Sequence, residues 1–344
     1  MRVVVCPDKF RGSLSAAAAT RAMVAGVRRV LGADADIVGL PLADGGEGTL
    51  DALVAAAGGS RRSVRVTGPL GDDVDAEYAV LSSGTAVIEM ARASGLELVS
   101  GRNDPLRAST RGTGELIAAV ARAGCKRIIV GVGGSATTDG GLAAVEALGW
   151  KLPQIDVIVA CDVETRFLDA ARLYGPQKGA TAAQVTLLTR RLESIAATFE
   201  QRTGIDVRGL EHSGAAGGLA GGLAALGARL EPGLDVIADV VGLDESLEHC
   251  DLVITGEGKL DATSLVGKVV GGVIERADEW AVAHRAVICG DADAEVRTAI
   301  QSEATRVYPL VERVWNAGEA FARAELLCEE AAVEATRHAL GRDA

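Results

Sequence analysis

The stretch Ile128-Ile-Val-Gly-Val-Gly-Gly-Ser-Ala-Thr-Thr-Asp-Gly-Gly141 decides the fold of this chain. Its continuous apolar run, Ile128–Val132, is typical of a strand buried in a parallel sheet. The glycines and hydroxyl residues that follow lead into a helix expected to begin near Asp139. Unpaired N–H groups at such a turn, together with the helix dipole, favour an anion, although a plain strand-to-helix turn is the alternative. The predicted phosphate cradle consists of Gly133, Gly134, Ser135, Thr137 and Asp139.

The same strand-then-glycine pattern recurs along the chain and predicts an α/β fold. Between residues 62 and 89 the pattern changes to alternating strands that are typical of an antiparallel sheet. We therefore expect two domains. The chain ends, 1–60 and 262–344, would form a Rossmann-like (flavodoxin-like) parallel sheet, and 61–261 would be an inserted α/β domain, with the active site in the cleft between them. Buried parallel strands are predicted at 2–6, 156–160, 252–255, 285–289 and 305–308.

Composition narrows the class of protein. Of the 344 residues, 48% are apolar, mostly Ala, Val and Leu, which suits parallel strands covered by alanine-rich helices. The net charge of −12 argues against a nucleic-acid partner, because phosphate-tracking surfaces are basic. Six cysteines without Cys-x-x-Cys spacing are expected to be reduced thiols. No leader or membrane-spanning run is recognisable, so we expect a cytoplasmic protein without a membrane partner.

Acidic residues follow two of the predicted strands. Asp44 and Glu47 lie among the glycines of Ala43-Asp-Gly-Gly-Glu-Gly-Thr49, where a simple turn would need only one acidic or amide residue. We interpret them as ligands of a metal or of a hydroxyl-bearing substrate; a plain turn is the alternative. Asp162 follows the strand 156–160, and carboxyl ends of parallel strands are where open α/β sheets keep their chemistry. Asp162 is therefore the best candidate for a catalytic carboxylate.

Cationic residues lie just before several predicted helices. Lys9 and Arg11 precede a helix that we expect to begin with Ser13 as its N-cap and to end near Leu31. Lys178 and Lys268 hold similar positions ahead of later helices. Solvated surface charge is the alternative for Lys9 and for Arg11. The glycine-rich segment 214–227 favours a helix that another backbone approaches closely, which is a packing role.

Seven motifs occur in a fixed order along nearly the whole chain. They are Cys6-Pro-Asp-Lys-Phe-Arg-Gly-Ser-Leu-Ser15, Ala43-Asp-Gly-Gly-Glu-Gly-Thr49, Gly131-Val-Gly-Gly-Ser-Ala-Thr-Thr-Asp-Gly-Gly141, Ala160-Cys-Asp-Val163, Gly175-Pro-Gln-Lys-Gly-Ala180, Gly214-Ala-Ala-Gly-Gly218 and Thr255-Gly-Glu-Gly-Lys-Leu-Asp261. Their order resembles that of the bacterial glycerate kinase family, and the resemblance implies two α/β domains, ATP as co-substrate and D-glycerate as acceptor.

The chain also departs from the pattern of that family. The connection between Trp150 and Asp156 is shorter than usual, and so is the loop after Val163, where an Asn-Pro-Leu segment is common. Lys9 replaces a common Ser, Arg11 a Lys, and Arg111 an aromatic residue. The change from Lys to Arg keeps the charge but alters the geometry of its donors. These differences bear on substrate preference more than on fold.

Phosphoryl transfer needs a phosphate site, a magnesium site, cationic charge and a base, and the sequence offers residues for each. Asp162 is the expected base, and Lys178 the second catalytic residue. Substrate would bind at Lys9, Arg11, Ser13 and Arg111. Gly256 and Lys268 would join the 133–139 cradle in binding ATP. The Mg²⁺ ligands would be Asp44, Glu47, Glu257 and Asp261. The resemblance favours 2-phosphoglycerate over 3-phosphoglycerate as the product.

Two other functions remain open from the sequence. Gly131-x-Gly133-x-x-Ala136 formally matches a dinucleotide fingerprint, which indicates an NAD(P)-dependent hydroxyacid dehydrogenase. Asp156 has the spacing of the ribose-binding acid in that motif, but it begins its strand instead of ending it. The other alternative is a non-catalytic relative of the kinase family that binds a nucleotide or a hydroxyacid. A homodimer is compatible with either class.

Overall fold

The computed structural model describes residues 1–342, and it divides into two compact units. The first unit comprises residues 1–44, 51–57 and 237 onward. The second comprises residues 45–50 and 58–236. The chain thus leaves the first unit between Asp44 and Gly45, inside one of the acidic motifs.

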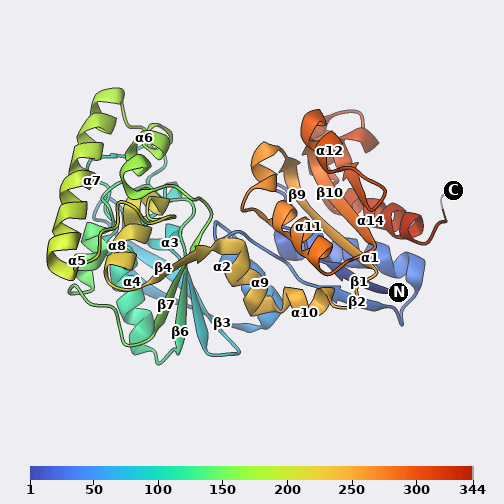
Figure 1. Cartoon of the computed structure of the whole chain (residues 1–344), viewed down its shortest axis with the longest axis horizontal. Coiled ribbons are helices and arrows are strands. Elements are labelled where there is room, and N and C mark those ends of the chain that lie inside the picture. Colours follow the sequence, from blue (N-terminus) through green and yellow to red (C-terminus); the bar gives the residue numbers. More distant parts are fainter. Residues whose placement is uncertain (343–344) are drawn as a thin grey trace. The chain divides into compact units, whose positions relative to one another are not determined.

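The first unit is built on a sheet in which each described strand pair is parallel. Numbered within this sheet alone, the strand order is 2-1-3-4-5, which is that of flavodoxin-like folds, so the expected Rossmann-like architecture is confirmed. The strands in spatial order are β11 (Thr305–Pro309), β10 (His284–Ala292), β9 (Leu252–Leu260), β1 (Arg2–Val5) and β2 (Asp36–Gly39) (Figure 1).

Helices pack on both faces of this sheet because its strands present apolar side chains to either side. Val3, Val5 and Ile254 pack with α1 (Ala16–Leu31) and α14 (Ala324–Ala339) on one face. Val287 and Cys289 pack with residues of α11 and α12 on the other. The remaining elements that lie wholly or partly in this unit are α2 (Thr49–Ala57), α9 (Gly233–Val241), α10 (Leu243–Leu247), η5 (Ala262–Leu265), α11 (Val269–Glu279), α12 (Ala294–Ile300), η6 (Leu310–Arg313) and α13 (Ala317–Ala322).

The first helix begins later than the sequence predicts. Ser15, not Ser13, is the N-cap of α1, and its Oγ accepts a hydrogen bond from the Ala18 amide at 3.2 Å. Ser13 instead closes a turn in which its hydroxyl donates to the Phe10 carbonyl at 3.1 Å. Ser13 thus belongs to the loop between β1 and α1, in which Gly12 has a φ of +80°.

The second unit contains a mixed sheet that changes from antiparallel to parallel across its width. β3, β4 and β5 pair antiparallel, whereas β5 to β8 pair parallel, as the two sequence patterns predict. In spatial order its strands are β3 (Gly59–Thr67), β4 (Asp73–Leu81), β5 (Thr85–Glu89), β6 (Arg127–Gly131), β7 (Asp156–Cys161) and β8 (Arg229–Pro232).

Two apolar clusters hold the helices of this unit in place. Ile88, Ile128 and Val130 pack with residues of α4 and α8 in the larger cluster. Phe167 and Phe199 meet edge-on, with ring centroids 6.2 Å apart, in the smaller cluster beneath α7. The helices are α3 (Ala91–Ser94), η1 (Glu97–Val99), α4 (Arg111–Arg122), α5 (Leu142–Ala147), η2 (Phe167–Asp169), α6 (Ala170–Tyr174), η3 (Pro176–Lys178), α7 (Ala182–Thr203), η4 (Ala215–Gly218) and α8 (Leu219–Ala225).

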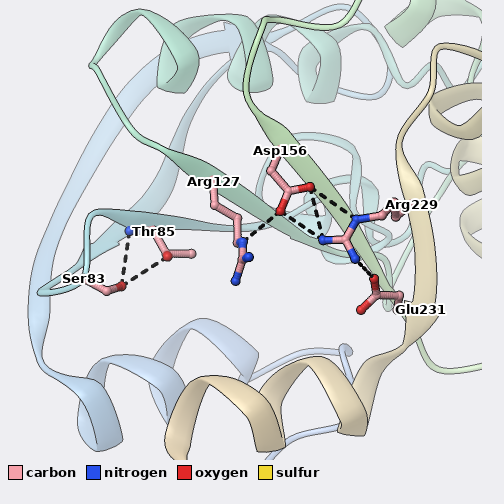
Figure 2. Close-up of polar contacts among 6 residues, drawn as sticks. All are labelled: Ser83, Thr85, Arg127, Asp156, Arg229 and Glu231. Atoms are coloured by element: carbon pink, nitrogen blue, oxygen red, sulfur yellow. Dashed lines mark hydrogen bonds and ion pairs between the residues drawn. The ribbon is translucent and has the colours of Figure 1, made fainter.

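An ion-pair network joins the amino ends of three strands in the second unit (Figure 2). Asp156, the first residue of β7, accepts from Arg127 Nε of β6 at 2.9 Å and from Arg229 Nη2 of β8 at 3.0 Å. Arg229 also pairs with Glu231. The two guanidinium groups hold the pKa of Asp156 below its usual value. Asp156 is therefore committed to an ion-pair network at the edge of the sheet opposite the carboxyl ends of the strands.

The boundary between the units differs from the predicted one. The predicted division at 261/262 would separate β9 from its sheet, yet β9 pairs with both β1 and β10. The second unit ends instead at residue 236, within α9. The sequence misled here because β8 and α9 carry no glycine-rich signal, whereas the motif after Thr255 does.

Two expectations from composition concern the cysteines and membrane-spanning helices. All six cysteines are buried free thiols, as predicted. Burial raises the pKa of the Cys250 thiol to about 11, so it is protonated at neutral pH. Across residues 1–342, the helices are all too short or too polar to cross a membrane.

Candidate active site

Asp8 lies at the point where the strand order of the first sheet reverses. Beyond β1, the chain continues beside β9, with the Cys6 amide donating to the Ile254 carbonyl and the Asp8 amide to that of Gly256, both at 2.8 Å. Open α/β sheets bind ligands at the carboxyl ends of the strands on either side of such a reversal. The first unit therefore places Asp8 and the Gly256–Glu257 pair where a ligand is expected.

Three carboxylates of this unit, Asp8, Asp44 and Glu257, lie close enough to repel one another; we call them the carboxylate cluster. Burial, with repulsion from Asp44, raises the pKa of Asp8 to about 7. Burial also raises the pKa of Glu257 to about 7, against a hydrogen bond from Ser264 and the charge of Lys268. The buried Glu257 Oε1 has no hydrogen-bond partner among the described residues. A bound cation would reduce the repulsion among the carboxylates and would give Glu257 Oε1 a partner.

Asp261, predicted as a metal ligand, has a different role in the structure. Its Oδ1 accepts from the Thr263 amide at 2.9 Å and from the Thr263 hydroxyl at 2.6 Å. Its own amide donates to Ser264 Oγ at 2.9 Å, which completes a capping box for η5. The Thr263 bonds lower the pKa of Asp261. Lys268, as predicted, directly precedes a helix, α11, and its charge reaches Glu257.

The 45–50 loop, which carries Glu47, is fixed to the second unit by backbone contacts. A Cβ at Gly131 would come within 2.6 Å of the Gly45 carbonyl oxygen, and one at Gly133 within 2.5 Å of the Gly46 Cα. Only glycine permits this approach. Glu89, which is 2% exposed, accepts from the Gly48 amide at 2.8 Å and from the Leu50 amide at 3.1 Å. Glu47 itself remains exposed at the tip.

The buried Lys178 side chain contacts the glycine loop, Gly133–Asp139. The Lys178 ammonium donates to Ser135 Oγ at 2.8 Å and to the Thr137 carbonyl at 2.6 Å. This lysine is 3% exposed, and burial lowers its pKa to about 7, an effect that Asp139 opposes. The loop is also tied to its neighbour segment, because the Ala136 amide donates to the Ser94 carbonyl at 3.0 Å. Lys178 thus supports the loop on its buried side, and the part of the loop that reaches solvent is the Gly133–Gly134 backbone.

The predicted helix start at Asp139 is wrong, and with it one part of the anion argument. The helix, α5, begins at Leu142 and has six residues, too short for a helix-dipole site. Asp139 is buried, and its Oδ2 accepts from the Thr110 amide and hydroxyl, both at 2.8 Å. Its other oxygen accepts from the Gly141 amide at 3.2 Å. We therefore reassign Asp139 from phosphate ligand to structural anchor of the loop.

The segment 214–225 approaches the glycine loop as closely as its glycines predict. A Cβ at Gly217 would come within 2.0 Å of the Thr137 carbonyl oxygen, and Gly217 has a φ of +67°. We expect Gly217→Ala to destabilise the fold by about 2–5 kcal/mol, since overpacking and a left-handed alanine add their costs. Gly204→Ala is the matched control, because Gly204 also has a positive φ (+78°) but no atom within 4 Å. Urea unfolding that gives equal losses for both variants would contradict the close contact.

Asp162 follows β7 at the carboxyl edge of the second sheet, as predicted. The shortened loop after it is held by a second segment. His212 Nδ1 contacts the Val163 carbonyl at 2.8 Å, and the Gly214 amide donates to the Thr165 carbonyl at 2.8 Å. His212 has a φ of +65°, an uncommon conformation for a residue other than glycine. The loop that follows Asp162 is therefore anchored by defined contacts despite its reduced length.

The predicted cationic residues fall into two groups. Arg11 and Ser13 lie in the loop between β1 and α1, beside Lys9, whose amide donates to Asp8 Oδ1 at 2.6 Å. Arg111 belongs to the other group, since it lies on the exposed surface of α4 and pairs with Glu115 at 2.9 Å. Its ion pair resembles an ordinary i,i+4 contact, so nothing in its surroundings distinguishes it as a substrate ligand.

Within residues 1–342, the structure brings together no group of three or more His, Cys, Asp or Glu side chains that could hold a metal by themselves. This does not conflict with a magnesium site, because Mg²⁺ usually keeps several waters and takes one or two carboxylates together with substrate phosphates. Of the four predicted ligands, Asp44 and Glu257 lie in the carboxylate cluster, Asp261 is a cap, and Glu47 belongs to the other unit.

Comparison with known proteins decides the family. The family model described as the glycerate kinase family matches residues 3–156 and 150–340. The chain belongs to the glycerate kinase family. The two matched segments meet at 150–156, where the sequence predicts a connection shorter than the family usually has.

Individual members of the glycerate kinase family match almost end to end. Glycerate 2-kinase of Escherichia coli is 38% identical over 359 aligned residues, with 93% of each chain covered. Glycerate kinase of Halalkalibacterium halodurans is 37% identical, with 96% of each chain covered. A crystal structure of a candidate glycerate kinase 2 from Salmonella typhimurium LT2 superposes with a TM-score of 0.83 at 34% identity, covering 99% of this chain and 98% of that one. The chain is accordingly an enzyme of the kinase class, and the dehydrogenase alternative is not favoured.

Proposed function

We propose that this enzyme transfers the γ-phosphoryl group of ATP to D-glycerate and releases 2-phosphoglycerate and ADP. The observation that carries the proposal is the family match, which spans nearly the whole chain and includes relatives named glycerate kinase and glycerate 2-kinase. The name of the Escherichia coli relative favours the 2-phosphate over the 3-phosphate.

Magnesium fits the residues of the carboxylate cluster. Two of its members have a pKa of about 7, and the buried Glu257 Oε1 lacks a hydrogen-bond partner among the described residues. Hard oxygen donors of this kind are what Mg²⁺ prefers. We propose Asp8 and Glu257 as the protein ligands, with Asp44 adding negative charge beside them. A bound Mg²⁺ would neutralise charge on the transferring phosphoryl group.

Asp162 is proposed as the general base. It would accept the proton of the attacking glycerate hydroxyl as that oxygen bonds to the γ-phosphorus. The bond between the γ-phosphorus and its bridging oxygen would then break, and ADP would leave with the electron pair. The position of Asp162 at the carboxyl end of β7 supports this role, as does the anchored loop that follows it.

Phosphate and substrate binding are assigned to the remaining exposed donors. Gly256 and Lys268 of the first unit are proposed to bind ATP phosphates. The Gly133 and Gly134 amides of the second unit are proposed as an anion site of their own. The buried Lys178 acts as a positioning residue, since its ammonium is directed at Ser135 and Thr137. Lys9 and Arg11 are proposed to neutralise the anionic groups of the substrates. Lys9 lies next to Asp8 of the carboxylate cluster, and Arg11 lies two residues further along the same loop.

A coupled assay of ADP release tests the function. Purified enzyme with Mg-ATP is expected to release ADP only when D-glycerate is added, and L-glycerate, lactate and glycerol serve as matched acceptors. Reduction of NAD⁺ by the same hydroxyacids is measured in parallel. ADP release without any dependence on D-glycerate would overturn the proposal and indicate ATP hydrolysis. No ADP release would also overturn it: NAD⁺ reduction would then favour the dehydrogenase, and its absence the non-catalytic relative.

A further inference from the structure

A cavity of about 280 Å³ lies in the first unit, at the carboxyl ends of β9 and β10. The loop after β1 forms one wall, and η6 with α13 forms another. Ligands of open α/β sheets bind along this edge. The side chains around the cavity are mostly apolar and include Phe10, Leu310, Val311, Ala320 and Phe321.

The floor of the cavity is bare backbone. Gly258 of β9 and Gly290 of β10 both line it, and they lie side by side in the sheet. A Cβ at Gly290 would come within 2.3 Å of the Gly258 carbonyl oxygen. A Cβ at Gly258 would in turn come within 2.9 Å of the Arg11 amide nitrogen. The two glycines therefore keep the floor flat and free of side chains.

An aromatic ring stands at the open side of the cavity. Phe321 of α13 is 57% exposed, although the chain has only ten aromatic residues in all. Its ring lies over Gly12, where a Cβ would come within 3.1 Å of the Phe321 Cε1. A phenyl ring exposed beside an apolar cavity offers a face on which a planar ring can stack.

Charged groups occur only at the rim. Arg11 and Lys259 supply positive charge, and Asp291 supplies a carboxylate at the end of β10. Lys259 also pairs with Asp293 at 3.2 Å, and Asp291 Oδ1 accepts from the Ala292 amide at 2.8 Å. A carboxylate at the end of a sheet strand suits the hydroxyls of a ribose, while the cations suit phosphates.

We propose that this cavity binds the purine base of the nucleotide, with Phe321 as the stacking residue. The inference rests on the proposed function, in which ATP is the donor. The volume lies just below the ~300–1,000 Å³ typical of sites for whole drug-sized ligands, so it suits one ring system better than an entire nucleotide. Glycerate, which is almost wholly polar, would leave the apolar walls unmatched. Glu257 directly precedes Gly258 on β9, so the carboxylate cluster and the cavity share this strand and lie on opposite faces of it.

Steady-state kinetics of three variants test this assignment. Phe321→Ala removes the stacking ring, and Ala317→Phe fills the cavity from α13. Leu326→Ala is the matched control, because it truncates an exposed apolar side chain of α14 that does not line the cavity. The first two variants are expected to raise KM for ATP by about 5- to 150-fold, the ratio that ~1–3 kcal/mol of stacking corresponds to. KM for D-glycerate should stay within about twofold of wild type in each case, which corresponds to a change in binding free energy of no more than about 0.4 kcal/mol.

Direct binding separates a failure of this assignment from a failure of the proposed function. Adenosine, which cannot donate a phosphoryl group, is titrated calorimetrically into wild-type enzyme and into Phe321→Ala. Binding that weakens by the same factor in the variant supports the base site even if no turnover occurs. A rise in KM for D-glycerate in place of ATP would assign the cavity to the acceptor. Unchanged KM for ATP and unchanged adenosine binding in both cavity variants would overturn the proposal.

Discussion

Asp162→Asn is expected to lower kcat for D-glycerate phosphorylation by about 10²–10⁴-fold, which is the usual contribution of a positioned general base. An amide cannot accept the hydroxyl proton, but it has almost the same size and can keep neighbouring hydrogen bonds. KM for ATP and for D-glycerate should therefore change little. Steady-state kinetics with both substrates varied measures the two effects separately.

Asp156→Asn provides the control on the same strand. Asp156 begins β7 and Asp162 directly follows it, so the identical substitution is made at opposite ends of one element. Asp156 takes part in a half-exposed ion-pair network (Figure 2), and exposed pairs contribute only about 0–1 kcal/mol. Asp156→Asn should then cost little stability and leave kcat unchanged. Near-wild-type kcat in Asp162→Asn would show that another group takes the proton.

Asp8→Asn is expected to stabilise the free enzyme while removing most of its activity. The pKa of Asp8 is raised to about 7 by burial and by Asp44, so its ionised form is unfavourable in the folded state. Loss of that charge should raise the free energy of unfolding at pH 8 by on the order of 1–3 kcal/mol. Loss of a proposed magnesium ligand should lower kcat/KM by about 10²-fold or more, since such ligands supply several kcal/mol of charge stabilisation. Thermal unfolding and kinetics together test the pair of effects.

The pH dependence of stability follows from the same groups. The pKa values of Asp8 and Glu257 are about 7 in the folded state, above the ordinary values of 3.8 and 4.5. Between those limits the folded state binds more protons than the unfolded state, so stability falls as pH rises from about 4 to about 7. Mg²⁺ should restore stability at pH 8 and have little effect at pH 5, where these carboxyls are protonated.

Asp261→Ala is the matched control for the stability effect. Asp261 lies four residues beyond Glu257, but its pKa is lowered because it caps η5. Its removal should cost about 0.5–2 kcal/mol, the usual value of an N-cap. Opposite signs for Asp8→Asn and Asp261→Ala are therefore expected. A destabilised Asp8→Asn, with no response of the wild type to Mg²⁺ at any pH, would rule out the carboxylate cluster as a cation site.

Much of the fold could be predicted because buried parallel strands are continuous apolar runs. Such runs indicated β1, β6, β7, β10 and β11 to within a few residues. The domain boundary could not be predicted, because the place of β9 depends on its pairing with β1, which lies about 250 residues away in the chain. Local sequence patterns carry no information on that pairing.

The candidate site was predictable where chemistry follows a strand end and obscure where it depends on tertiary contacts. Asp162 and Glu257 follow or extend recognisable strands. Asp8 lies within a quoted motif, but its raised pKa arises from Asp44 and from burial beside β9. Glu89 gives no sequence signal for its role, because its partners are amides of the distant 45–50 loop. The one feature of the sequence that could have indicated this role is that Glu89 is an acidic residue at the end of an apolar strand.

Phosphorus-31 NMR of the reaction product tests the central claim most directly. Enzyme, Mg-ATP and D-glycerate are incubated until ADP release stops, and the spectrum is recorded without proton decoupling. The predicted result is one new phosphomonoester resonance, split into a doublet by the single C2 proton, at an amount equal to the ADP formed. A triplet, from the two C3 protons, would move the transfer to the 3-hydroxyl. Intact ATP and no phosphomonoester would contradict the assignment of this chain as an ATP-dependent glycerate kinase.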